Sequence, residues 1–248
     1  FRQLGKLIMR DVERRRRDGI RSHDIVSQLL DARDRQSGDA MSDRQLLDEI
    51  MTLIIAGHET TASTLNWFWY LLASTPDAAA RVAAEADAGG DRFPGYDDLA
   101  KYPYARRALD ETLRMYPPGW LLTRRSIAAS SLAGFALPPK CDVLISPYLI
   151  QRHPAWWPNP DEFNPDRFLP ERFANNPAYL PFGRGPRMCI AAQFALAEMT
   201  VVVARLLARR ALANEALARS RGFDLARQLR VNARIIEDMQ DGVVVVDV

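Results

Sequence analysis

The sequence has few cysteines: only Cys141 and Cys189 occur among 248 residues. Two cysteines cannot form a disulfide framework, and their separation does not match the paired ligand spacing of a structural zinc site. No apolar run approaches the ~20 residues that a membrane-spanning helix requires, and the first residues lack the pattern of a signal peptide. We therefore expect a cytoplasmic protein without a membrane span, and the start at Phe1 leads us to expect that its natural N-terminus is missing.

The chain also lacks an excess of charge of one sign. Its 33 basic and 31 acidic residues give a net charge of +2, which does not indicate a nucleic-acid partner. Hydrophobic residues make up 48% of the chain, enough to bury a core. These figures predict a globular protein that binds no nucleic acid.

The residues before Cys189 differ from those expected around an ordinary buried cysteine. Residues 181–191 read PFGRGPRMCIA, and the glycines allow backbone conformations closed to other residues. A helix is predicted directly after Cys189, and its dipole would favour a thiolate there. A thiolate could serve as a nucleophile or as a soft metal ligand, and Arg187 suits a carboxylate neighbour. The loop is therefore a candidate site.

Helix signals are strongest from Ser42 onward. Ser42 and Gln45 match a capping box, Met41 and Leu46 occupy the positions of a hydrophobic staple, and Pro76 stops the helix. Apolar residues fall on every face, which predicts a buried central helix.

The remaining chain is predicted to be mainly α with small β elements. A second helix should start near Pro103 and end before the prolines at 117–118. Short strands are predicted at 132–137 and 143–146. Seven prolines between positions 154 and 181 predict a meandering loop, and helix returns after Cys189.

The loop FGRGPRMC resembles the cysteine-ligand loop of the cytochrome P-450 family, the haem-thiolate monooxygenases. Three further stretches are similar to family motifs and follow the family's order. AGHETT at 56–61 is similar to the oxygen-activation stretch of the long central helix, ETLR at 111–114 to the Glu-x-x-Arg pair, and FNPDRF at 163–168 to the meander segment. The resemblance implies that residues 1–208 are a partial haem domain, the C-terminal half of the cytochrome P-450 fold.

The resemblance implies haem b, iron protoporphyrin IX, as the cofactor, with Cys189 as the axial ligand of its iron. Arg187 and Arg124 would bind the propionates, and Arg125 is a close competitor for the second role. The other positions that the resemblance places against the cofactor are Phe182, Gly183, Ala56 and Gly57.

In the central helix, the resemblance assigns catalytic roles to Glu59 and Thr60, which would relay protons to the reacting oxygen. Gly57, which costs about 1 kcal/mol in a helix interior relative to alanine, would open a groove where a ligand meets the helix backbone. A packing role is the alternative for Gly57. His58 is expected to be a surface or packed residue rather than an iron ligand.

Glu111 and Arg114 lie three residues apart on one helix face and could form an ordinary surface pair. The resemblance implies instead a structural ion-pair set with Arg167. LPERF at 169–173 repeats the same signature, but FNPDRF preserves more of the pattern, with Asp166 in place of the usual glutamate.

Two positions depart from the family pattern. Ala191 stands two residues after Cys189, where glycine is usual. Lys140 stands in a turn where glycine is expected, so this turn is predicted to be strained or altered.

Residues 209–248 are expected to form a separate segment, either a linker or a coiled-coil helix followed by the start of a PAS-like segment. The stretch resembles the signalling helix that leads into a PAS domain in bacterial sensor kinases. A plain surface helix with a β-rich tail is the alternative. The heptad seam behind this expectation consists of Leu225, Leu229, Asn232, Ile236 and Met239.

The resemblance implies an enzyme that takes electrons from a donor such as a ferredoxin or flavin reductase system. It would insert one oxygen atom of dioxygen into a small apolar substrate. The alternative is a non-catalytic haem-binding or association fragment fused to a signalling helix. Self-association or poor solubility is expected of this chain alone. A helix that is apolar on every face needs partners on every face, and a chain without the N-terminal half that the resemblance implies would leave apolar surface uncovered.

Overall fold

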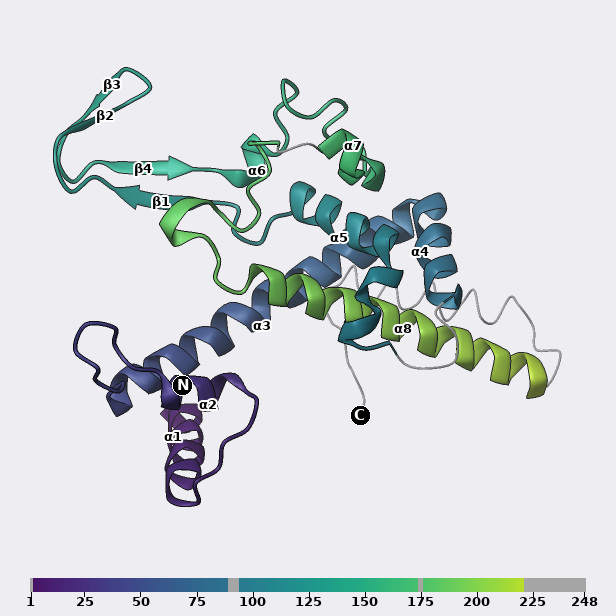
Figure 1. Cartoon of the computed structure of the whole chain (residues 1–248). Coiled ribbons are helices and arrows are strands. Elements are labelled where there is room, and N and C mark those ends of the chain that lie inside the picture. Colours follow the sequence, from purple (N-terminus) through teal and green to yellow (C-terminus); the bar gives the residue numbers. More distant parts are fainter. Residues whose placement is uncertain (1, 89–93, 174–175, 221–248) are drawn as a thin grey trace. The chain divides into compact units, whose positions relative to one another are not determined.

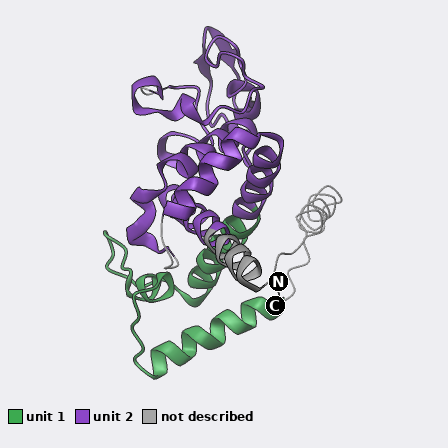
Figure 2. Ribbon diagram, turned by 90° about the vertical axis from the view of Figure 1, so that its right-hand side faces the viewer, with its two compact units in different colours: residues 1–59 green, residues 60–248 purple. Residues whose placement is uncertain are grey.

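The structure is a computed structural model that describes residues 2–88, 94–173 and 176–220. These residues are mainly helical, as predicted (Figure 1). The chain divides into two compact units, residues 1–59 and residues 60–248 (Figure 2). None of the helices in the described ranges has a run long and apolar enough to cross a bilayer.

The first unit contains α1 (Arg2–Arg17), α2 (Ile25–Asp31) and the beginning of α3 (Asp43–Ser74). Its small core joins Val12 of α1 to Leu46 and Ile50 of α3. The start of α3 agrees with the predicted capping box. The backbone N–H of Ser42 donates to Gln45 Oε1 at 3.0 Å, and the N–H of Gln45 donates to Ser42 Oγ at 3.3 Å.

The second unit has a helical core. The helices α4 (Pro76–Ala88), α5 (Pro103–Met115) and α8 (Ala192–Ser220) pack against one another, and the 3₁₀ helix η1 (Tyr96–Lys101) packs on α8. The prolines act as predicted: Pro76 follows the end of α3, and Pro103 begins α5. The buried core residues include Phe68, Leu72, Val82, Leu109, Leu113, Met199 and Val203.

Two small antiparallel sheets follow α5. One pairs β1 (Leu122–Arg125) with β4 (Asp142–Ile145), and the other is the hairpin of β2 (Ser130–Leu132) and β3 (Phe135–Leu137). The sequence patterns predicted β4 and a single strand at 132–137, where the structure has the turn and β3 of the hairpin, and they missed β1. Lys140 has a φ of 64°, a left-handed conformation that favours glycine, so the predicted strain at this turn is present.

Among its described residues, the proline-rich stretch at 154–181 contains only short helical turns, as predicted. These are η2 (Pro165–Phe168) and α7 (Pro170–Phe173), and α6 (Pro147–Ile150) lies just before the stretch. Aromatic side chains hold the stretch together: Phe168 lies with its ring centroid 5.0 Å from that of Tyr179 and 6.1 Å from that of Trp157.

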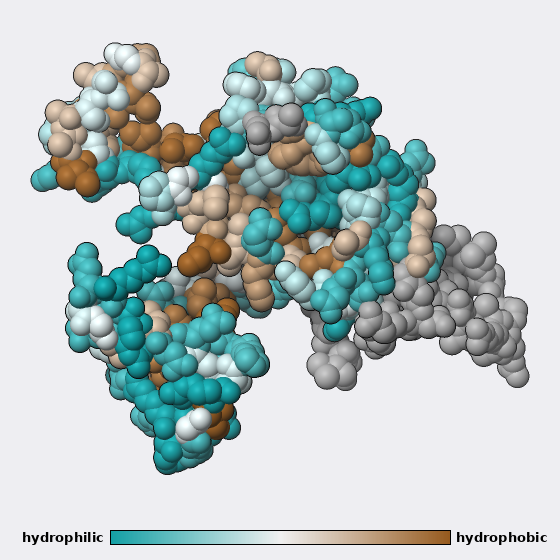
Figure 3. Space-filling model, viewed as in Figure 1, coloured by the Kyte–Doolittle hydropathy of each residue, from teal (hydrophilic) through white to brown (hydrophobic). Residues whose placement is uncertain are grey.

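The expectation that α3 is a buried central helix is wrong for its middle, whereas the expectation that this chain leaves apolar surface uncovered is confirmed there. Ile54 is 42% exposed and Ile55 is 47% exposed, and residues 54–60 are all exposed. The reason is that none of the described residues covers this stretch, although the helix has the apolar composition of a buried one. Apolar surface is also exposed on the hairpin and the neighbouring strands, shown in brown in Figure 3.

Candidate active site

The cysteine loop is shaped by two glycines and one backbone hydrogen bond. Gly183 and Gly185 have φ values of 71° and 76°, which only glycine adopts readily. The N–H of Cys189 donates to the carbonyl oxygen of Phe182 at 2.9 Å, which closes the loop. The short 3₁₀ helix η3 (Gly185–Arg187) lies within it. The loop therefore has a defined shape, and it leaves Cys189 exposed.

Cys189 lies close to the start of a helix, as expected. The first hydrogen bond of α8 runs from the N–H of Ala195 to the carbonyl oxygen of Ala191, two residues after Cys189. The N–H groups of the first turn of a helix have no partners within that helix. The position therefore places the thiol beside the positive end of the helix dipole. Alanine at 191 does not prevent the helix from starting there.

The two competing arginines of β1 differ in their partners. Arg125 lies opposite Asp142 in the sheet and donates to both of its carboxylate oxygens at 2.7 Å. Arg124 donates only to the carbonyl oxygen of Thr123, at 2.8 Å. Within the described ranges, neither Arg124 nor Arg187 has a carboxylate partner.

Strand β1 also lies against the cysteine loop. A Cβ atom placed on Gly183 would lie 3.8 Å from Cδ1 of Leu122. Leu122 and Arg124 are two residues apart in a strand and therefore share a face. Arg124 is thus on the loop side of β1, and Arg125 is on the other side with Asp142.

The structure brings Glu111, Arg114 and Arg167 together. Arg114 Nε donates to Glu111 Oε2 at 2.7 Å, and its NH2 group donates to Oε1 at 2.9 Å. Arg167 Nε donates to the same Oε1 at 3.3 Å. The side chains of Glu111 and Arg114 are both 0% exposed, so the reading as an ordinary surface pair is wrong. Burial raises the pKa of Glu111, and the hydrogen bond from Arg114 opposes that shift.

The ion-pair set is also bonded to the meander. Arg114 donates to the carbonyl oxygen of Gln151 at 2.9 Å and to that of Glu162 at 3.3 Å. Arg167 donates to the carbonyl oxygens of Pro158 and Asn159. The set therefore fixes the path of the backbone on both sides of residue 160. These backbone partners could not be found in the sequence, because carbonyl groups carry no residue-specific signal.

The predicted residues of α3 lie on one exposed stretch of helix. Ala56, Gly57, Glu59 and Thr60 are all exposed, and so is His58. A Cβ atom on Gly57 would meet nothing within 4 Å outside the backbone of the helix itself. The described residues therefore give no packing reason for this glycine. The boundary between the two compact units falls between Glu59 and Thr60.

The residues of the predicted heptad seam, at 225–239, and the PAS-like segment after them lie outside the described residues. Helix α8 itself continues to Ser220.

Comparison with known proteins identifies the family. The family model for cytochrome P-450 matches residues 2–213, which is most of the chain. Cyclooctatin synthase of Streptomyces melanosporofaciens is 44% identical over 195 residues, which cover 77% of this chain and 42% of that protein. Pentalenene oxygenase of Streptomyces avermitilis is 36% identical, over 78% of this chain and 44% of that protein.

The fold agrees with this relationship. The crystal structure of the cytochrome P450DA haem domain matches with a TM-score of 0.78 and 33% identity, over 83% of this chain and 46% of that one. The chain belongs to the cytochrome P-450 family. It spans about half the length of the relatives that it matches.

Proposed function

We propose that the chain is the haem-binding part of a haem-thiolate monooxygenase, with residues 1–208 as its partial haem domain. The observation that carries the proposal is the exposed Cys189 thiol, at the start of α8 on a loop that also adjoins the Arg124 face of β1. The names of relatives support oxygen insertion, since one is cyclooctat-9-en-7-ol 5-monooxygenase and another is pentalenene oxygenase.

The residues of the loop fit haem b chemically. A thiolate is a suitable axial ligand for haem iron, and the loop presents the Cys189 sulfur without covering it. Haem carries two carboxylates, and Arg124 and Arg187 are guanidinium groups without a carboxylate partner among the described residues. Glycine at 183 leaves the backbone uncovered, and any larger side chain there would be strained at its φ of 71°. When bound, haem would supply the iron at which dioxygen is activated and one oxygen atom is inserted into an apolar substrate.

The protein's own groups have separate roles in this proposal. Cys189 would hold the iron through its thiolate, and Arg124 and Arg187 would hold the propionates. Glu59 and Thr60 present a carboxylate and a hydroxyl group that pass protons from solvent towards the reacting oxygen. Electrons come from a separate donor, such as a ferredoxin or flavin reductase system.

The experiment supplies the purified chain with haem, a generic reductase system and an apolar test substrate under isotope-labelled dioxygen. Incorporation of one labelled oxygen atom per product molecule supports the proposal. Electron consumption that yields only peroxide, with haem bound, supports the second candidate function, a haem-binding or association segment without turnover. The exposure of residues 54–60 favours that second candidate for this chain alone, because water would reach the proton-relay groups freely.

A further inference from the structure

Gln151 is a buried polar residue that the proposed chemistry does not use. It follows α6, and its side chain is fully buried, at 0% exposure. Its amide NH2 group donates to the carbonyl oxygens of Leu113 and Arg114, both at 3.0 Å. Its amide oxygen accepts from the N–H of Leu180 at 2.7 Å. All three bonds go to backbone groups in two other parts of the chain.

The first two bonds are made at the end of α5. Leu113 and Arg114 belong to the last turn of this helix, where carbonyl groups lack partners within the helix. Gln151 also accepts a hydrogen bond from the Arg114 guanidinium through its own backbone carbonyl, at 2.9 Å. Its side chain and its backbone are therefore both bonded to the helix that carries the buried ion pair.

The third bond leads to the cysteine loop. The carbonyl oxygen of Leu180 accepts from the N–H of Gly183 at 3.1 Å, and two residues after Leu180 the carbonyl oxygen of Phe182 accepts from the N–H of Cys189. A short series of bonds thus runs from Arg114 through Gln151 and Leu180 to the backbone at Cys189. A shift of Leu180 would therefore pass along the chain to Phe182, whose carbonyl oxygen is hydrogen-bonded to Cys189.

We propose that Gln151 is a positioning residue for the cysteine loop, and that its carboxamide holds the loop in register with the end of α5. The chemistry of the side chain supports this role. Only an amide provides two donors and an acceptor in one rigid plane of this size, and buried polar groups of this kind are costly if any bond is missing. The inference about loop position stands on these bonds alone, whereas its consequence for the iron rests on the proposed function.

The main test compares wild type with Gln151→Met, which preserves the length of the side chain and removes all three bonds. A second contact between this part of the chain and α5 is retained in the variant, since the Tyr179 hydroxyl donates to Asp110 Oδ1 at 2.9 Å. The matched control is Thr200→Val, which removes one buried hydrogen bond within α8, to the carbonyl oxygen of Leu196, and none to the loop.

The first readout is amide hydrogen exchange in the haem-free chain. In Gln151→Met, the amides of Leu180 and Cys189 should exchange at least about tenfold faster than in wild type, as expected for the loss of a buried hydrogen bond. Amides in the middle of α8 should change little. Equal acceleration of the loop and of α8, or the same loop acceleration in Thr200→Val, would overturn the proposal. Rapid exchange of the Leu180 amide in the wild-type chain would also overturn the proposal, and this measurement requires no variant.

The second readout is the spectrum of the reduced, carbon-monoxide-treated chain with haem. If wild type gives the thiolate-type spectrum, Gln151→Met should lower its fraction at equal haem content, and Thr200→Val should not. An unchanged fraction would contradict the proposed role. If wild type gives no such spectrum, the haem proposal fails, while hydrogen exchange still decides the role of Gln151.

Discussion

Glu111 and Arg114 form a two-point ion pair in which both side chains are completely buried. Moving two charges out of water is costly, and here the cost is offset because every charged atom of the pair has a hydrogen-bond partner. Arg167 and the N–H of Asn164 both donate to Glu111 Oε1, the latter at 2.9 Å. The pair therefore depends on the meander, and the meander depends on the pair.

Removal of Glu111 should destabilise the fold strongly. In Glu111→Ala, two guanidinium groups lose their carboxylate, and breaking a buried pair typically costs ~3–5 kcal/mol. We expect loss of soluble, haem-binding protein, measured as soluble yield and haem content. The matched control is Asp142→Ala, which breaks the two-point pair with Arg125 on the exposed surface. It should leave yield and haem content close to wild type, and equal losses in both variants would contradict this reading.

Thr60 should affect the use of electrons rather than folding. Its side chain is exposed on α3, so we expect Thr60→Ala to leave the unfolding free energy nearly unchanged. In a haem-loaded protein that turns over, the variant should divert electrons to peroxide. The control is Thr52→Ala, which removes an exposed hydroxyl two turns earlier in the same helix. Equal product per electron in wild type and Thr60→Ala would refute the proton-relay role.

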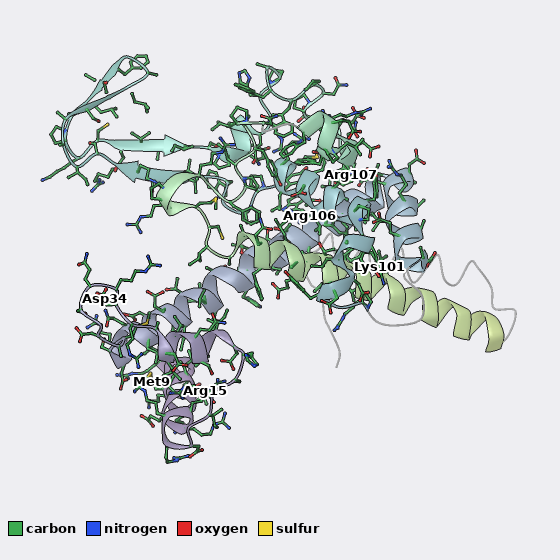
Figure 4. All side chains as sticks on the ribbon, viewed as in Figure 1. Met9, Arg15, Asp34, Lys101, Arg106 and Arg107 are labelled. Carbon is green, nitrogen blue, oxygen red and sulfur yellow. The ribbon has the colours of Figure 1, made fainter. Side chains whose placement is uncertain are left out.

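Asp110 should make the stability of the fold depend on pH. It lies on α5 beside Arg106, labelled in Figure 4, and burial raises the pKa of its carboxyl group, against the opposing effects of Arg106 and Tyr179. The folded state then binds the proton more tightly than the unfolded state. Stability should therefore fall as pH rises from about 4, the ordinary pKa of aspartate, through the raised value.

The variant Asp110→Asn cannot titrate and still accepts a hydrogen bond from the Tyr179 hydroxyl. Its unfolding free energy should decline less than that of wild type as pH rises through this range. Chemical denaturation at a series of pH values measures the difference. Parallel pH profiles for the two proteins would show that Asp110 titrates alike in the folded and unfolded states.

Exposed apolar side chains on the hairpin region should cause self-association (Figure 3). Ile127 is 98% exposed and Phe135 is 75% exposed, and exposed apolar patches commonly mark contact surfaces. Replacement of both by serine should reduce the mass in solution without loss of helical content. Tyr96→Ser removes a single exposed aromatic ring on η1 and should not reduce it. A wild-type chain that stays monomeric at high concentration would contradict the prediction.

The sequence predicted the elements whose signals are local. Ser42 with Gln45 marked the start of α3, Pro103 marked the start of α5, and the motif pattern chose Arg167 rather than Arg172 as the partner of Glu111. The structure brings Arg167 to Glu111, because the 3₁₀ turn at Pro165 directs it there.

Other features depend on contacts that no local pattern contains. Strand β1 was missed because LTRR has no alternating apolar pattern, and pairing with β4 defines it. The apolar pattern of α3 predicted that residues 54–60 are buried, which is wrong. Composition shows which residues a helix can bury, but not whether other parts of the chain pack over them. Gln151 belongs to no sequence motif that marks a functional residue. Its role is visible only from the three hydrogen bonds that its side chain makes to backbone groups.

The central claim is that Cys189 is the axial thiolate ligand of haem iron, and one spectrum tests it most directly. The chain is loaded with haem, reduced and treated with carbon monoxide, in parallel for wild type, Cys189→His and Cys141→Ser. The account predicts the red-shifted thiolate-type band in wild type and Cys141→Ser, and its complete loss in Cys189→His. An unchanged band in Cys189→His, or loss of the band in Cys141→Ser alone, would contradict it.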